Sequence, residues 1–170
     1  ALVCLGGNGT NSTASFLYDA GFNVIGLPKT IDNDILGTDE TFGFQSAIEV
    51  ATAGLESIRT TARSHSRIMV VEIMGHKVGW LALYSGIAAN ADVILLPEIP
   101  YNIKKLSASI KKKLANGQNY LIVACSEGAL NEDEAKLSKK EYKKAREAMT
   151  QSVAYRVAKE IEAETGYETR

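Results

Sequence analysis

Two carboxylates, an amide, a hydroxyl and a cation are concentrated in residues 29–34, which read Lys-Thr-Ile-Asp-Asn-Asp. Phosphoryl transfer needs a base that takes a proton from the attacking hydroxyl, oxygen ligands for a metal ion, and cations around the moving group. This segment contains all three kinds of group. The alternative is a surface turn in which Asp32, Asn33 and Asp34 bond only their own backbone.

A second candidate motif is the glycine-rich segment of residues 6–10, Gly-Gly-Asn-Gly-Thr, which lies between a predicted strand and a helix beginning near Asn11. Free backbone N–H groups and the helix dipole at such a turn suit a phosphate, although tight packing is the alternative explanation. The segment lacks the Lys-Ser/Thr of a P-loop and the spacing of a dinucleotide fingerprint. Both motifs follow consecutive predicted strands, so we expect them to converge on one crevice.

Short apolar runs separated mostly by segments of helical period predict an α/β fold, a Rossmann-like three-layer sandwich with a mainly parallel sheet. The predicted strands are Ala1–Leu5, Phe22–Leu27, Ile68–Ile73, Val93–Leu96 and Tyr120–Ala124.

Three apolar stripes predict the helices that cover this sheet. One stripe runs through residues 44–58, and another through 103–114 with lysines on its opposite side and Gly117 as its stop. Ser138 and Glu141 have the spacing of a capping box. The apolar stripe that follows to Gly166 predicts one long last helix.

The composition is that of one ordinary domain, with 170 residues, 45% apolar and 23% charged. A net charge of −1, from 19 basic and 20 acidic residues, provides no bulk attraction to nucleic acid or to an anionic membrane, so we expect neither as a partner. Cys4 and Cys125 each lie in an apolar run and are expected in the core. Without a signal peptide or a long apolar span, a soluble, cytoplasmic protein is expected.

In these motifs the sequence resembles the phosphofructokinase family, over nearly its whole length. Residues 6–10 resemble the family's Gly-Gly-Asp-Gly-Ser phosphate loop, and residues 28–34 resemble its catalytic loop. Further similar segments are Ser64–Arg67, Glu72–His76, Ser126–Gly128 and Tyr167–Arg170. The resemblance implies the phosphofructokinase fold, in incomplete form, and transfer of a phosphoryl group to the C1 hydroxyl of fructose 6-phosphate in glycolysis, under allosteric control.

The resemblance also implies a role for each matching residue. Asp32 is the expected base, with Thr30 and Asp34 beside it holding substrate or magnesium. The sugar phosphate is expected to contact Thr30, Asp32, Arg67, Met74, Gly75, His76, Glu127 and Arg170. In the family the two arginines come from a neighbouring subunit, which implies a dimer or tetramer. Each of these residues also has a purely structural alternative. Arg67 could pair with a surface acid, and Met74 could be a core residue.

The donor phosphates are expected at Gly7, Asn8, Gly9, Thr10 and Lys29. Two residues depart from the commonest family pattern. Asn8 stands where an Asp usually supports magnesium, and an amide oxygen is a weaker ligand. His76 stands where the family has a permanently charged Arg; it is a candidate catalytic residue, with a plain turn residue as the alternative.

Two positions bear on the choice of phosphoryl donor, and they favour different donors. Gly9 leaves room for the α-phosphate of ATP, whereas pyrophosphate-dependent members carry an Asp there. Lys29 is typical of pyrophosphate enzymes. We weight Gly9 more heavily because excluding a nucleotide requires a clash, so ATP with Mg²⁺ is expected, in a long or mixed-substrate branch, with pyrophosphate as the alternative.

Members of the family are about twice as long. We therefore expect residues 1–43 to be a fragment of the donor lobe with the phosphate and catalytic loops, and residues 44–170 to be most of the sugar lobe. As an internal piece of a longer enzyme the chain is expected to be inactive alone. Two other readings remain: a nucleotide or lipid kinase such as an NAD or diacylglycerol kinase, and a non-catalytic regulatory homologue that binds the sugar phosphate.

Overall fold

The computed structural model describes residues 1–170 and contains five strands, six α-helices and one 3-10 helix. In chain order they are β1 (Leu2–Gly6), α1 (Asn8–Asp19), β2 (Val24–Pro28), α2 (Phe44–His65), β3 (Ile68–Ile73), α3 (Trp80–Ala88), β4 (Val93–Leu95), α4 (Ile103–Ala115), β5 (Leu121–Ser126), η1 (Glu134–Lys136), α5 (Lys139–Glu147) and α6 (Val153–Thr165). All five predicted strands are present and every pairing between them is parallel, which confirms the α/β class.

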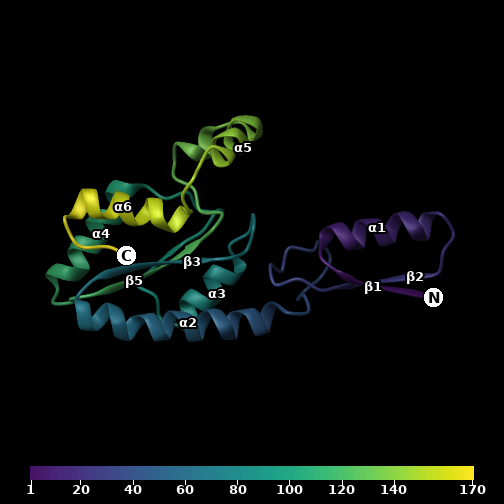
Figure 1. Cartoon of the computed structure of the whole chain (residues 1–170), viewed down its shortest axis with the longest axis horizontal. Helices are drawn as coiled ribbons and strands as arrows, with labels where there is room; N and C mark the ends of the chain where they lie inside the picture. Colours follow the sequence, from purple (N-terminus) through teal and green to yellow (C-terminus); the bar gives the residue numbers. More distant parts are fainter.

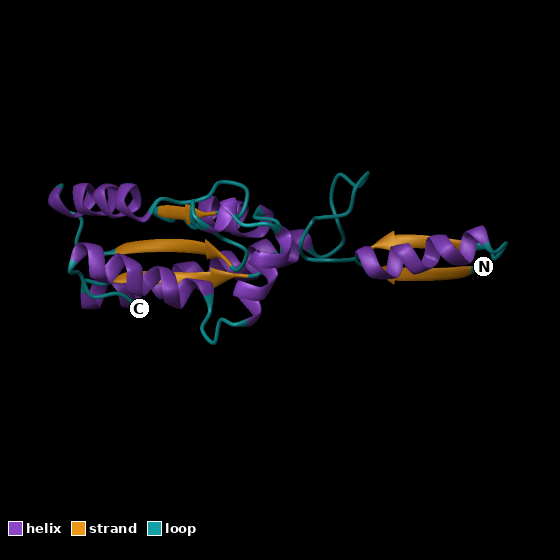
Figure 2. Cartoon of the chain, turned by 90° about the horizontal axis from the view of Figure 1, so that it is seen from above, coloured by secondary structure: helices purple, strands orange, loops and turns teal.

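The strands are divided between two sheets, whereas the sequence pattern alone suggested one. The first sheet pairs β1 with β2, and the second has the order β3-β5-β4. The two bodies lie end to end, joined by the loop that follows β2, as Figure 1 and Figure 2 both show. Within this loop, Phe42 pairs with Lys29 in an isolated parallel bridge. The chain then enters α2 and so leaves the first sheet without adding a third strand to it.

The second body, residues 44–170, is the predicted three-layer sandwich. In Figure 1, α2 and α3 cover one face of the sheet, while α4 and α6 cover the other. The central strand β5 is buried at all six positions, because both of its faces are covered. One core is centred on Ile110, Val157 and Ile161, and the other on Leu55, Ala62 and Ile122.

The first body has little core of its own. Among residues 1–40 only Gly6 and Ala14 are buried, because a single helix covers one face of a two-stranded sheet. Large apolar side chains such as Leu5, which is 58% exposed, remain open to solvent. Cys4 is accordingly half-buried, whereas Cys125 is fully buried in β5 as expected. Burial raises the pKa of the Cys125 thiol to about 12, which makes it chemically inert.

Helix ends follow local capping, and one prediction about them is wrong. The capping box of Ser138 and Glu141 is present and begins α5. The expected single last helix is divided into α5 and α6, because Ser152 has an extended backbone and its side chain accepts a hydrogen bond from the backbone N–H of Tyr155, which begins a new helix. The helix after β1 starts at Asn8, three residues earlier than expected. No helix is both long enough and apolar enough to cross a bilayer.

Candidate functional site

The two chemistry-bearing motifs lie together where β1 and β2 end. The register pairs Gly6 with Pro28, the last residues of the two strands. The backbone N–H of Lys29 donates to the carbonyl of Gly6 at 2.9 Å, and the side-chain amide of Asn11 holds the carbonyls of Gly6 and Gly7 at 2.8 and 3.0 Å. The expected convergence of the glycine-rich loop and the Asp-containing loop is therefore confirmed.

The glycine-rich loop presents the free N-terminus of α1. Gly7 is the N-cap in an extended conformation, and no side chain caps the first-turn N–H groups. No acidic residue lies in that turn either, so its positive end is available to an anion. A side chain at Gly6 would collide with Thr10, whereas a Cβ atom at Gly9 would meet nothing within 4 Å. The space beside Gly9 is therefore open, and packing within the fold does not require a glycine at this position.

The two loops are joined by one pair of side chains. The Asn8 amide donates to the Asp34 carboxylate at 2.9 Å and to the Asp34 carbonyl at 3.3 Å. Because the amide is neutral, it approaches the carboxylate without repulsion and without a bridging cation. Asn8 therefore orients Asp34.

The Asp-containing loop is held by residues whose importance the sequence did not reveal. Asn33 has a positive φ of 53° and accepts a hydrogen bond at 2.9 Å from the backbone N–H of Thr41. The buried Thr41 hydroxyl donates to the carbonyl of Thr30 at 2.8 Å. The Thr30 hydroxyl accepts from the backbone N–H of Asp32 at 3.2 Å. Thr38 and Thr41 do follow the Asp residues, but Thr41 lies eight residues from Asn33 and eleven from Thr30, so no local pattern marks these contacts.

The turn after β3 is held by a carboxylate from the loop after β5. Gly75 and His76 both have positive φ, 149° and 53°, and their N–H groups donate to Oε1 of Glu127 at 3.0 and 2.6 Å. A Cβ atom at Gly75 would lie 2.5 Å from the Val78 carbonyl oxygen. Met74 is 61% exposed, which excludes the alternative of a core methionine. Glu127 is itself steadied by Arg146, whose Nη2 donates to its carbonyl at 2.6 Å.

The pKa of the Asp32 carboxyl is influenced by charged groups from both bodies of the molecule. Burial is the main cause that raises the pKa of its carboxyl, and the nearby Asp34 and Glu127 carboxylates raise it further. His76 and the hydrogen bond from Thr30 act in the opposite direction. The Asp32 carboxyl is thus near enough to Asp34, Glu127 and His76 for their charges to act on its pKa.

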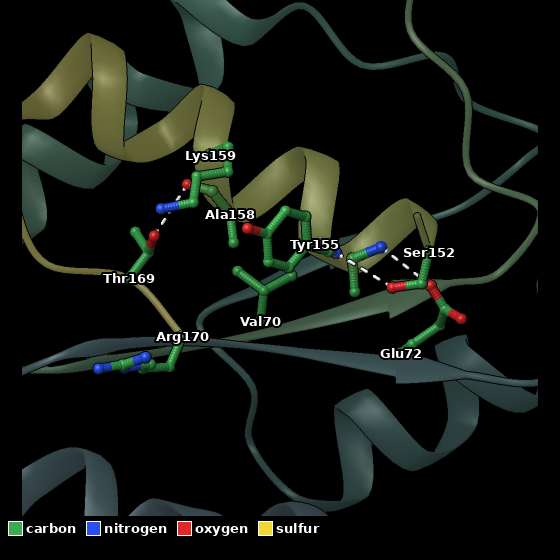
Figure 3. A pocket seen from close by; sticks show the side chains of 9 residues that line it. Val70, Glu72, Ser152, Tyr155, Ala158, Lys159, Thr169 and Arg170 are labelled. Carbon is green, nitrogen blue, oxygen red and sulfur yellow. Dashed lines mark hydrogen bonds between the residues drawn. The ribbon is translucent and has the colours of Figure 1, made fainter. Parts of the chain in front are cut away.

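Arg67 and Arg170 are not part of this cluster. Arg67 immediately precedes β3 and Met74 immediately follows it, so the six-residue strand separates them by about 20 Å. The guanidinium of Arg67 pairs with Glu168 at 2.7 Å, as the surface-acid alternative predicted, and that of Arg170 lies 3.8 Å from the same carboxylate. The backbone of Arg170 bonds to β3 at Ile68 and Val70. Figure 3 shows Arg170 beside Val70 at the groove between β3 and α6.

The donor set around Asp32 fits magnesium in one specific way. No three His, Cys, Asp or Glu side chains form a cluster that could enclose a metal ion. Mg²⁺ is commonly held by one or two carboxylates together with substrate phosphates and water. Asp32 and Asp34 provide such carboxylates, whereas the amide nitrogen of Asn8 is occupied with Asp34.

Comparisons with known proteins agree over the whole chain. A family model described as phosphofructokinase matches residues 1–170. An ATP-dependent 6-phosphofructokinase from Propionibacterium freudenreichii subsp. shermanii is 58% identical over 135 residues, which are 79% of this chain and 36% of that protein. One with the same name from Spirochaeta thermophila is 52% identical over 170 residues, covering 99% of this chain and 46% of that protein.

A solved structure shares the fold. Phosphofructokinase from Saccharomyces cerevisiae matches with a TM-score of 0.79 at 30% identity, over 99% of this chain and 24% of that chain. The chain thus spans less than half the length of these relatives.

Proposed function

The chain belongs to the phosphofructokinase family, and from this membership we propose that the intact protein transfers a phosphoryl group from ATP to the C1 hydroxyl of fructose 6-phosphate, giving fructose 1,6-bisphosphate in glycolysis. The observation that carries the proposal is the environment of Asp32, whose pKa is affected by Asp34 in its own loop and by His76 and Glu127 of the other body. A base placed between two bodies can meet a donor held by one and an acceptor held by the other. We accordingly assign the donor to residues 1–43 and the sugar to residues 44–170.

Asp32 takes the proton from the C1 hydroxyl as that oxygen attacks the phosphorus atom. Its raised pKa makes the carboxylate a better proton acceptor. Thr30 positions Asp32 through the hydrogen bond from its backbone N–H. The sugar hydroxyls meet Met74, Gly75 and the second oxygen of Glu127, because Oε1 is already used by the turn.

The donor phosphates lie at the open N-terminus of α1, near Gly7, Asn8, Gly9 and Thr10, with Lys29 and His76 as the basic side chains assigned to the moving group. Asp34 and Asp32 would hold Mg²⁺, which neutralises phosphate charge during transfer. Asn8 keeps Asp34 in place for that contact.

ATP is the donor that the open space at Gly9 favours, since a nucleotide needs that volume for its α-phosphate. The names of the relatives reported above agree with this choice. Pyrophosphate is the second candidate, because Lys29 places an exposed ammonium directly after the last residue of β2.

Arg67 and Arg170 bind the sugar 6-phosphate of a neighbouring subunit in this proposal. Their position at the far end of β3 supports it, because within one chain they cannot reach a substrate beside Asp32. The pairing of both side chains around Glu168 keeps the two guanidinium groups together. A dimer or tetramer follows, and a cytoplasmic location remains a prediction.

The test is formation of fructose 1,6-bisphosphate by the intact protein with Mg²⁺, fructose 6-phosphate and either ATP or pyrophosphate. Turnover with ATP and little with pyrophosphate is expected. Turnover with pyrophosphate alone would replace ATP as the donor and leave the acceptor unchanged. Binding of fructose 6-phosphate without turnover on any donor would contradict the catalytic proposal and favour a regulatory homologue.

A further inference from the structure

A basic cleft of about 770 Å³ lies beside the turn at His76, between that turn and α5. Helix α5 stands off the body of the molecule in Figure 1. Lys139, Lys143 and Arg146 line the cleft from α5, and His76 and Lys77 line it from the turn. No residue of the function proposed above except His76 lies on its wall.

The positive charge of this cleft is largely uncompensated. No carboxylate is among its lining residues. Lys77, Lys139 and Arg146 form no ion pair within 4.0 Å, and Lys143 has only an exposed contact of 3.7 Å with Glu147. Such exposed pairs are weak and are screened by salt.

Arg146 holds its guanidinium at the cleft wall through two contacts with the protein. Its Nη2 donates to the Glu127 carbonyl at 2.6 Å, and the guanidinium carbon lies 6.0 Å from the centre of the Tyr142 ring. A guanidinium fixed in this way can use its remaining N–H groups for a ligand with little loss of side-chain freedom. Tyr142 lies on the same wall and adds a hydroxyl.

We propose that this cleft binds a small phosphate-bearing anion. Several ammonium groups and one fixed guanidinium, without an opposing carboxylate, match a phosphate dianion in charge and in hydrogen-bond donors. The overall charge of −1 and the confined volume argue against a nucleic acid as the occupant. The anion is either a separate phosphorylated compound that binds next to the turn or the phosphate of the sugar substrate, which would then replace the contact proposed for Arg67 and Arg170.

The test measures binding of inorganic phosphate to the intact protein by ³¹P NMR titration, in parallel with binding of fructose 6-phosphate by calorimetry. Lys139→Gln/Lys143→Gln should raise the dissociation constant for phosphate on the order of tenfold. The matched control is Lys111→Gln/Lys112→Gln on the polar side of α4, which changes the net charge equally and should leave phosphate binding unaltered. Both variants alter exposed side chains only, and circular dichroism checks that they fold.

Binding of fructose 6-phosphate distinguishes the two possible identities of the anion. If the cleft takes the substrate's own phosphate, fructose 6-phosphate displaces inorganic phosphate and its own affinity falls in Lys139→Gln/Lys143→Gln. If the cleft takes another compound, fructose 6-phosphate binds that variant as it binds the parent protein. Unchanged phosphate binding in the variant, or an equal loss in the control, would overturn the proposal. Neither readout requires turnover, so the result is independent of the proposed activity.

Discussion

The side-chain amide of Asn8 donates a 2.9 Å hydrogen bond to the carboxylate of Asp34, and so connects the glycine-rich loop to the Asp-containing loop. Replacing this amide with a carboxylate would place two negative charges at hydrogen-bonding distance. A divalent cation between them would remove the repulsion. The contact therefore explains how the two loops stay together before any metal or donor binds.

Asn8→Asp should lower the melting temperature without metal and should regain much of the loss when MgCl₂ is added, because the cation bridges the two carboxylates. Asn8→Ala is the control: it loses the hydrogen bond, about 1 kcal/mol, but gains no carboxylate for the metal. Thermal unfolding with and without Mg²⁺ measures both. If Mg²⁺ does not raise the melting temperature of Asn8→Asp, the carboxylates at positions 8 and 34 are not placed to share a metal ion.

Asp32→Asn should reduce turnover by about 10²- to 10⁴-fold, because the amide cannot accept the proton from the sugar hydroxyl. Binding of fructose 6-phosphate should change little, since the amide has nearly the same volume. The measurement is the rate of fructose 1,6-bisphosphate formation alongside a binding titration. A variant that retains full turnover would remove Asp32 from the role of base.

The raised pKa of Asp32 also predicts a change in stability with pH. Between the ordinary value of 3.8 and the raised value, the folded protein binds more protons at this carboxyl than the unfolded chain, so its contribution to stability falls as the pH rises through this window. Asp32→Asn should thus be more stable than the parent at pH 7, and the gap should close in acid. Replacement of the exposed Asp39 by Asn is the control for the loss of a carboxylate at the surface. A gap that widens in acid would contradict the assigned direction.

Gly75→Ala should destabilise the protein by roughly 1–3 kcal/mol and weaken sugar binding, since a Cβ atom there meets the Val78 carbonyl at 2.5 Å and the φ of 149° is strained for alanine. Gly54→Ala in α2 is the matched control: its Cβ meets nothing within 4 Å, and alanine should stabilise the helix by up to about 1 kcal/mol. Urea unfolding of both variants tests the contrast. Equal effects of the two changes would show that the turn adapts.

Gly9→Asp should raise the Michaelis constant for ATP far more than that for pyrophosphate, because the carboxylate fills the open space at the start of α1 and repels the α-phosphate. Gly9→Ser fills a similar space without the charge and separates the two causes. Steady-state rates with each donor give the answer. Undiminished use of ATP by Gly9→Asp would mean that the nucleotide does not pass this position.

Much of the site could be predicted because its first half is local. The loops at residues 6–10 and 29–34 each follow a strand, and two consecutive parallel strands that pair bring their carboxyl ends together whatever else the fold does. The contacts that hold those loops could not be predicted. Thr41 bonds to Thr30 and Asn33 within an irregular loop, and such a loop has no repeating pattern from which the contacts could be inferred.

The sequence by itself determined the strands, the starts of the helices at residues 44 and 103, the capping box at Ser138 and the candidate residues, since side-chain periodicity and capping depend on neighbours a few residues away. Only the tertiary structure decided that Glu127 holds the turn at Gly75, 52 residues earlier, and that Arg67 and Arg170 share Glu168 at the opposite end of β3. It also decided that the strands form two sheets and that α5 encloses a basic cleft. Such contacts arise when distant elements pack against one another, and that packing depends on the shape and burial of whole faces, which local sequence pattern does not specify.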